Sequence, residues 1–338
     1  MSAGGEGEQE INALVVKFII DVFTDGLEKA APLWKHLANE GKKRQIGGTQ
    51  IQFPAKLLKN QSQGFISGTG ATVSATPSVQ LQYGTLPWKY YNYNVNFSIK
   101  DYNEAYGSAL AVRDFFADKI EGAAEDAFRD LAAACWGSGN DNPLAFNGLK
   151  DILAASGTSY AGLLNTDYDA GVYEPVDTSD SVNGTTVNYT AINILITLVQ
   201  ARMQAGAKVN KKMMGLCNEA VFEKFKSSVQ AQQRFVNEDD VAKTGFKGFL
   251  VNGVEFYLDA FAFGSRDNST KDNWAVIFPV DVIKFYYNYG FDNPSPFDTS
   301  KDGLQLPLQP IKSIQKYITG NIVCTNRRLV AVNKTLVA

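Results

Sequence analysis

The spacing of hydrophobic residues predicts two short helices near the start of the chain. From Ile11 to Phe23, apolar side chains recur at steps of three and four residues, which is typical of one face of a helix. A second helical stretch is expected from Leu27 to Asn39. We expect the first helix to be an amphipathic arm whose apolar face contacts another surface. The candidate arm contacts are Leu14, Phe18, Ile19 and Phe23.

The pattern changes to alternation between Ile46 and Lys100, which predicts strands joined in a hairpin. Val95, Phe97 and Ile99 alternate with polar residues, as in a strand with one buried face. A two-stranded ribbon is marginal in water by itself, so the hairpin should lie on another surface, such as a neighbouring copy of the chain. The residues expected to make this inter-subunit clasp are Ile51, Phe53, Phe65, Ile66, Val79, Leu81 and Tyr83.

The tip of this hairpin, Gln61 to Ser78, is rich in Gln, Ser, Gly, Thr and Ala and has few apolar residues. Ordering each residue costs roughly 1–2 kcal/mol of backbone entropy, which so few apolar groups do not offset. We therefore expect the tip to be mobile in a free subunit and to become ordered only against neighbouring subunits.

Helical spacing returns at Asp101 and continues to Trp136, where Gly137 and Gly139 end it. Asp101 and Glu104 form an acidic variant of a capping box. At 1.5 Å per residue this helix is roughly 54 Å long, more than a core of this size requires. The residues expected to bury it against a sheet are Phe116, Ile120, Phe128 and Leu131.

The second half of the chain alternates helices and strands. Tyr189 to Ala205 has helical spacing, Met213 to Cys217 is a short apolar strand, and Val221 to Val229 is helical again. Asn252-Gly253 between two apolar runs is the strongest short hairpin signal. Apolar, β-branched sequence from Thr319 to Leu336 predicts closing strands.

Composition then excludes several function classes. The chain has 338 residues, 32 Lys and Arg against 35 Asp and Glu, and a net charge of −3, which argues against tight nucleic-acid binding through a uniformly basic face. His36 is the single histidine, so multi-histidine metal sites and most histidine-dependent catalysis are disfavoured. Cys135, Cys217 and Cys324 are odd in number and far apart, as expected of buried thiols in a reducing compartment. We expect no catalytic residues, no cofactor, no metal and no membrane span, and an intracellular site of synthesis.

A few motifs could carry chemistry, but each has a simpler structural interpretation. Gly68-Thr-Gly70 lacks the strand and helix of a dinucleotide site, and the acidic residues at 177, 180 and 238–240 lie in turn-like sequence. Lys42-Lys43-Arg44 is interpreted as a solvated turn or, alternatively, as a phosphate contact. His36 is expected to be structural. The aromatic residues Trp88, Tyr90, Tyr91 and Tyr93 could stack on bases or sugars, although packing at the base of the hairpin is favoured.

The order of these elements, and the phrase Trp136-Gly-Ser-Gly-Asn-Asp-Asn-Pro-Leu-Ala-Phe-Asn-Gly148-Leu after the long helix, resemble the major capsid protein of tailed bacteriophages. That α+β fold is shared with encapsulin shells and the herpesvirus capsid floor. The resemblance implies an N-terminal arm at 1–45, an extended β-hairpin loop at 46–100, a peripheral domain at 101–186 with a spine helix at 101–136, an axial α/β domain at 187–300, and return strands at 301–338.

The resemblance also implies function and partners. The chain would form hexamers and pentamers of an icosahedral virion shell, assembled in the bacterial host cytoplasm around double-stranded DNA that it contacts weakly and without sequence specificity. A portal protein and a decoration protein are further expected partners. Because the arm begins within about ten residues of Met1, any scaffolding protein is expected to be a separate chain. The alternatives are an encapsulin-like nanocompartment, disfavoured by the long loop and arm helix, and a carbohydrate-binding or hydrolysing protein.

Overall fold

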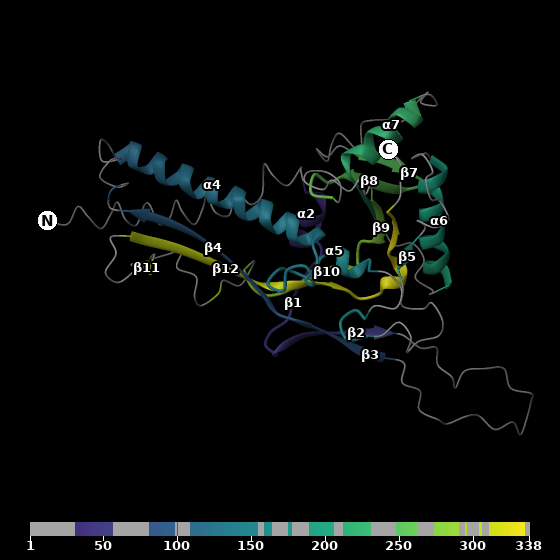
Figure 1. Ribbon diagram of the computed structural model, residues 1–338, viewed down its shortest axis with the longest axis horizontal. Helices are drawn as coiled ribbons and strands as arrows, with labels where there is room; N and C mark the ends of the chain where they lie inside the picture. The colour runs from purple at the N-terminus through teal and green to yellow at the C-terminus, as the bar shows by residue number, and fades with distance from the viewer. Residues whose placement is uncertain are drawn as a thin grey trace, which may run out of the picture.

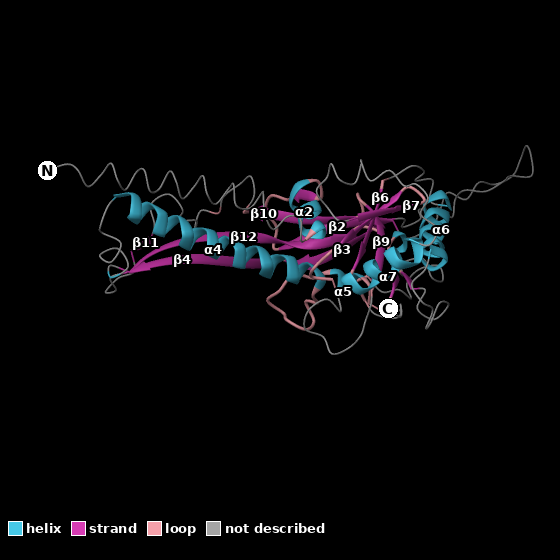
Figure 2. Ribbon diagram, turned by 90° about the horizontal axis from the view of Figure 1, so that it is seen from above, coloured by secondary structure: helices cyan, strands magenta, loops and turns pink. Residues whose placement is uncertain are grey.

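The computed structural model is an elongated molecule in which a long helix and two long strands extend from a mixed α/β body (Figure 1). Seen along its edge, it is thin, with α2 toward one broad face and α5 and α7 toward the other (Figure 2). The structure describes residues 31–56, 81–98, 100, 109–154, 159–163, 175–177, 189–205, 212–230, 248–262, 274–290, 295, 304–305 and 311–334.

The extended part is built on β12 (Ile311–Cys324), the longest strand of the described chain. β12 pairs antiparallel with β4 (Lys89–Ser98) over Ile311 to Gly320, and with β10 (Ile283–Tyr289) toward its C-terminal end. Two short strands complete this sheet: β1 (Lys42–Arg44), parallel to β10, and β11 (Leu304–Gln305), antiparallel to β12. One strand thus runs from the extended part into the body.

The body contains a second, six-stranded sheet in the order β5-β13-β9-β6-β8-β7. Every residue of its central strands β6 (Met213–Cys217) and β9 (Ala275–Pro279) is buried. β7 (Gly248–Val251) and β8 (Val254–Leu258) form the predicted hairpin, and Asn252 and Gly253 have the positive φ angles, 47° and 78°, that its tight turn requires. The other strands are β5 (Val176–Asp177) and β13 (Ala331–Asn333).

Helices α6 (Tyr189–Ala205) and α7 (Glu219–Gln230) belong to this body, and the predicted bounds of α6 are confirmed. The short helices α2 (Pro32–Asn39) and α5 (Leu149–Ile152) lie closer to the long helix. A single-turn 3-10 helix, η3 (Arg327–Leu329), connects β12 to β13. No helix in the described part of the chain is long and apolar enough to cross a membrane.

The long helix, α4 (Ala109–Trp136), has 28 described residues, about 42 Å at 1.5 Å per residue. Its end at Trp136 is confirmed, whereas its predicted capping box at Asp101 and Glu104 lies outside the described residues. Ile120 packs with Val95, Phe97 and Ile314 in a small cluster under the extended part. Phe128 and Leu131 belong to the main core of the body. The helix therefore joins two separate hydrophobic clusters.

The predicted strands between Ile46 and Lys100 divide between two sheets. β2 (Gln50–Lys56) and β3 (Leu81–Pro87) pair as an antiparallel hairpin, with Phe53 opposite Gly84. β4, which follows directly, pairs with β12 instead. The burial of β4 alternates, and its inward side chains Val95 and Phe97 face α4.

Candidate assembly surfaces

The base of the β2–β3 hairpin is anchored in its own subunit. Ile51, Phe53 and Ala55 are fully buried, and the ring of Phe53 lies 6.4 Å from that of Tyr160. The backbone N–H of Thr85 donates to the carbonyl of Ala161 at 2.9 Å. Ile51 and Phe53, which were expected to clasp a neighbouring copy, are buried within their own subunit, and Tyr160 packs against Phe53. The hairpin base does have a second layer, which sequence spacing did not reveal.

Gly84 is part of the same anchor. A Cβ added to Gly84 would lie 2.5 Å from Cζ of Phe53, so the aromatic ring occupies the space above the glycine. This packing of Phe53 turns the opposite face of the hairpin outward. On that face Tyr83 is 64% exposed, and Gln52 and Pro54 are exposed as well. Of the clasp residues whose side chains the structure describes, Tyr83 is the exposed one.

Most of the other contacts predicted from the sequence fall outside the described residues. Phe65, Ile66 and Val79 lie outside the described residues, as do the arm residues Leu14, Phe18, Ile19 and Phe23. The side chains of Leu81 and Phe116 are also outside the described part. Among the spine residues, Ile120 and Phe128 are each 2% exposed and Leu131 is fully buried.

A network of polar side chains, here called the polar junction, lies where α4, α5, β12 and the hairpin meet. It consists of Ser138, Asn140, Asn147, Asp151 and Asn321. The carboxylate of Asp151 accepts hydrogen bonds from Ser138 Oγ at 2.5 Å, Gly139 N at 2.8 Å, Asn147 Nδ2 at 2.9 Å and Asn140 Nδ2 at 3.3 Å. One carboxylate thus organises the turn that follows α4.

Asn321 connects this turn to the hairpin. Its Oδ1 accepts from Asn147 N at 2.8 Å, and its Nδ2 donates to Asn147 Oδ1 at 2.8 Å and to Pro87 O at 3.0 Å. Pro87 ends β3, and a single residue, Trp88, separates it from β4. Asn321 is fully buried, so these bonds form in a low-dielectric environment where each is stronger than in water. The polar junction therefore fixes the hairpin relative to α4 and β12. The turn sequence after Trp136 was singled out from the sequence alone. The hydrogen bonds of Asn321 to this turn became visible only in the folded structure.

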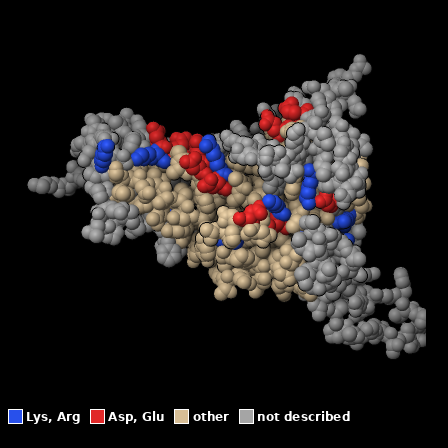
Figure 3. All heavy atoms as spheres, in the orientation of Figure 1, with Lys and Arg blue, Asp and Glu red and all other residues tan. Residues whose placement is uncertain are grey.

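The outer surface of α4 is acidic. Asp118, Glu121, Asp126 and Asp130 are exposed, against Arg129 as the exposed basic residue of the same stretch. Figure 3 shows acidic side chains, with basic ones among them, over the region of α4. The hydroxyl of Tyr91 on β4 donates to Asp130 Oδ2 at 3.2 Å, and burial together with Asp130 raises the pKa of Tyr91. Tyr91 and the buried Tyr93 therefore serve packing, as favoured from the sequence, while Tyr90 is 70% exposed.

The basic triplet Lys42-Lys43-Arg44 is not a turn but the strand β1. Lys43 Nζ lies 3.2 Å from the hydroxyl of Tyr286 and 4.9 Å from the centre of its ring. The turn interpretation is wrong because Gly41 O accepts from Phe285 N at 2.9 Å and starts a parallel ladder with β10. Pairing with a distant strand is not visible in a three-residue pattern.

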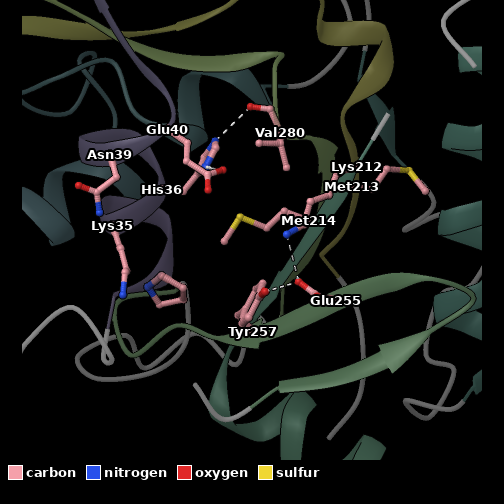
Figure 4. Close-up of a pocket in the computed structure, with 11 residues that line it drawn as sticks. Lys35, His36, Asn39, Glu40, Lys212, Met213, Met214, Glu255, Tyr257 and Val280 are labelled. Atoms are coloured by element: carbon pink, nitrogen blue, oxygen red, sulfur yellow. Dashed lines mark hydrogen bonds and ion pairs between the residues drawn. The ribbon is translucent and has the colours of Figure 1, made fainter. Parts of the chain in front are cut away.

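A cavity of about 140 Å³ lies between α2 and the strands β6 and β8. Figure 4 shows His36 and Glu40 on one side and Lys212, Met214, Glu255 and Tyr257 on the other. Lys212 and Glu255 form an ion pair at 3.6 Å. His36 is 8% exposed, in keeping with a structural role. The residues that line this cavity are two methionines and side chains of both charges, and they do not place a nucleophile beside a base.

The described residues contain no group of three or more His, Cys, Asp or Glu side chains placed to hold a metal ion. Asp177 forms an ion pair with Lys334 at 2.8 Å, while the other acidic turn residues at 180 and 238–240 lie outside the described part. Cys135, Cys217 and Cys324 are buried free thiols, and burial raises the pKa of Cys324 to about 12.

Comparison with solved structures identifies the fold. The chain is similar to the cyanophage A-1(L) capsid, with 16% identity, a TM-score of 0.61, and coverage of 90% of this chain and 92% of that chain. This chain has the phage capsid fold. It is also similar to the capsid of the native GTA particle, with 14% identity, a TM-score of 0.57 and 91% of each chain covered. The capsid of the empty GTA particle has 14% identity and a TM-score of 0.52, over 91% of this chain and 97% of that chain.

No family model matches the chain, and no curated protein matches it in sequence. The resemblance inferred from the order of elements and the phrase after α4 is confirmed at the level of the fold. The similar structures are capsid proteins, which are structural proteins rather than enzymes.

Proposed function

We propose that this chain is a major capsid protein that assembles with copies of itself into the icosahedral shell of a tailed bacteriophage. The observation that carries the proposal is the phage capsid fold together with a hairpin that is anchored in its own subunit at Phe53 and presents Tyr83 outward. Exposed apolar surface on a projecting, rigidly attached element is typical of a surface used in association.

Charge segregation supports contact between the hairpin of one copy and the α4 surface of the next. From Gly41 to Lys100 the sequence has no Asp or Glu. Of the basic residues in that stretch, Lys56 and Lys59 belong to the hairpin segment, while Lys42, Lys43 and Arg44 lie in β1 and Lys89 begins β4. The exposed surface of α4 is acidic by contrast. Opposite charges on surfaces that meet steer association and suppress wrong partners, so assembly should weaken as salt rises.

The assignment of segments and partners belongs to the same proposal. Residues 1–45 act as the arm, 46–100 as the extended loop, 101–186 as the peripheral domain, 187–300 as the axial domain and 301–338 as return strands. Hexamers and pentamers form the shell in the bacterial cytoplasm with a separate scaffolding protein, a portal and, in some particles, a decoration protein. The shell encloses double-stranded DNA, and a net charge of −3 keeps that contact weak.

Electron microscopy tests the proposal directly. The chain is expressed with its scaffolding partner, and closed particles of uniform diameter are the expected result over a range of salt and scaffold ratios. Monomers or amorphous aggregate under all these conditions would overturn it. A monomer that is stabilised by sugars would instead support the carbohydrate-binding alternative.

Removal of the hairpin tip should separate folding from assembly. Deleting Gly64 to Thr72 is expected to leave the melting temperature of the subunit nearly unchanged and to weaken particle assembly, because the polar tip contributes little to the subunit's own core. Limited proteolysis gives a second measurement. Cleavage between Gln61 and Ser78 should be fast in subunits and strongly suppressed in particles, and equal rates in both states would contradict an inter-subunit role.

A further inference from the structure

The cavity between α2 and the strands β6 and β8 has fixed walls. Helix α2 is tied to the core in its first turn, where Leu33 N donates to the buried carboxylate of Asp259 at 3.3 Å. It is tied again at His36, whose Nε2 lies 3.1 Å from the carbonyl oxygen of Val280. The other wall is the buried strand β6 with its parallel neighbour β8. The cavity of about 140 Å³ is therefore part of the fold, and an apolar cavity of about 150 Å³ is large enough for benzene.

Two hydrogen-bond acceptors face one another on the α2 wall of this cavity. The carbonyl of Val280 can only accept, so Nε2 of His36 carries the proton of the neutral ring and Nδ1 is an acceptor. Nδ1 lies 3.8 Å from Oε2 of Glu40, which is too long for a hydrogen bond. Among the described residues, no lysine or arginine forms an ion pair with Glu40. A group that donates hydrogen bonds to both Nδ1 and Oε2 would bridge these two atoms.

The electrostatics of the α2 wall favour a cationic donor. Burial lowers the pKa of His36, with Lys212 and Lys284 acting in the same direction and the Val280 hydrogen bond and Glu40 opposing. The ring is therefore neutral at pH 7.5, and its Nδ1 keeps a lone pair. The side chain of Glu40 is 73% exposed and carries a negative charge at that pH. The wall thus presents a lone pair and a negative charge next to each other.

The opposite side of the cavity is apolar. Figure 4 shows the side chain of Met214 pointing toward His36 and Glu40. A thioether is polarisable and adapts its shape to an apolar group. The rest of the apolar lining comes from Pro32, the ring of Tyr257 and Val280. A molecule in the cavity would meet two acceptors at one end and apolar surface at the other.

The charged groups on the sheet side already have partners. Nζ of Lys212 lies 3.6 Å from Oε2 of Glu255, and the hydroxyl of Tyr257 donates to the same oxygen. Burial, Glu255 and Glu40 raise the pKa of Tyr257, so the charge of Glu40 also acts across the cavity. Lys35 lies on the rim as well, which makes a comparison of cationic and anionic ligands decisive.

We propose that this cavity binds a small organic ammonium ion. The ammonium group bridges Nδ1 of His36 and the carboxylate of Glu40, and a short apolar body lies against Met214, Tyr257 and Val280. A primary ammonium has three donors and no acceptor, so it can satisfy both acceptors at once, and its charge complements Glu40. The site belongs to a single subunit and exists whether or not the chain forms a shell.

Three probes with one branched body and different head groups test the proposal: 3-methylbutylamine, 3-methylbutan-1-ol and 3-methylbutanoate. Each is titrated into the full chain at pH 7.5, and binding is followed by NMR at the methyl group of Met214. The amine should bind about fivefold more tightly than the alcohol, the ratio expected for a charge pair with a largely exposed carboxylate. The carboxylate should bind most weakly, because it brings no donor and the same charge as Glu40. No binding of the amine, equal affinity of amine and alcohol, or tighter binding of the carboxylate would overturn the proposal.

Two variants and one resonance locate the ammonium group. Glu40→Gln removes the charge at nearly constant size, so the affinity for the amine should fall about fivefold while that for the alcohol stays unchanged. Glu121→Gln makes the same change on the exposed surface of α4 and should leave both affinities unchanged. His36 is the single histidine, so its Nδ1 nitrogen resonance is unambiguous and should shift when the amine is added. An unshifted Nδ1 resonance at saturation, or equal loss of amine binding in Glu40→Gln and Glu121→Gln, would contradict the proposed position.

Discussion

Replacing Phe128 by alanine is expected to lower the free energy of unfolding by about 3–5 kcal/mol. Phe128 is 2% exposed and lies on α4 within the main core, where neighbouring side chains from several elements surround it. The loss combines the transfer free energy of the ring with the cost of the cavity it leaves, and rigid neighbours fill such a cavity only in part. Urea unfolding monitored by circular dichroism measures the change.

Arg129→Ala provides the matched control at the next position. The Arg129 side chain is 52% exposed, and its ion pair with Asp126 spans 3.9 Å, so its loss should change the free energy of unfolding by less than about 0.5 kcal/mol. If Phe128→Ala is as stable as Arg129→Ala, then α4 does not join the two hydrophobic clusters as described.

Replacing Asp151 by alanine should lower the free energy of unfolding by about 2–4 kcal/mol, because several hydrogen-bond donors of the polar junction lose their acceptor together. Ser138 Oγ, Gly139 N and Asn147 Nδ2 all donate to this carboxylate within 2.9 Å. Asp151 is 8% exposed, so water replaces the lost acceptor poorly. Urea unfolding again gives the magnitude, and hydrogen exchange at Gly139 and Asn147 locates the change.

The control for this variant is Asp141→Ala in the same turn. Asp141 is 62% exposed and pairs with Lys150 at 2.6 Å on the surface, where an ion pair contributes about 0–1 kcal/mol. Equal effects of the two substitutions would show that the polar junction adds nothing beyond surface charge. A further consequence is expected in the shell: with the polar junction weakened, the hairpin should lose its fixed angle to α4, and particles should become heterogeneous in diameter.

Local sequence signals predicted the elements whose cause lies within a few residues. α4 ends at Trp136, where the sequence predicted its end, and the β7–β8 turn forms because Asn252 and Gly253 tolerate positive φ. The buried strand β6 was visible as a short apolar run bounded by polar residues. The order of these elements was also sufficient to indicate the capsid fold.

The sequence was misleading where a distant segment supplied the partner. β1 was interpreted as a turn because three basic residues have no apolar periodicity, yet its backbone pairs with β10. Ile51 and Phe53 were expected to contact a neighbouring subunit, yet both are buried within their own subunit, with Phe53 against Tyr160. In both cases the partner lies more than a hundred residues away, and no local pattern encodes it.

By itself, then, the sequence determined most of the longer helices and strands, the absence of recognisable catalytic motifs and the resemblance to capsid proteins, because turn residues and hydrophobic periodicity act over a few residues. Tertiary structure alone decided which surfaces remain available: it buried Phe53, left Tyr83 exposed, brought Asn321 to the turn after α4 and placed Asp259 at the start of α2. The physical reason is that burial and hydrogen-bond partnership are properties of the whole packed chain. A side chain's neighbours are set by how the sheets and α4 come together, and the residue's own flanking sequence does not specify them.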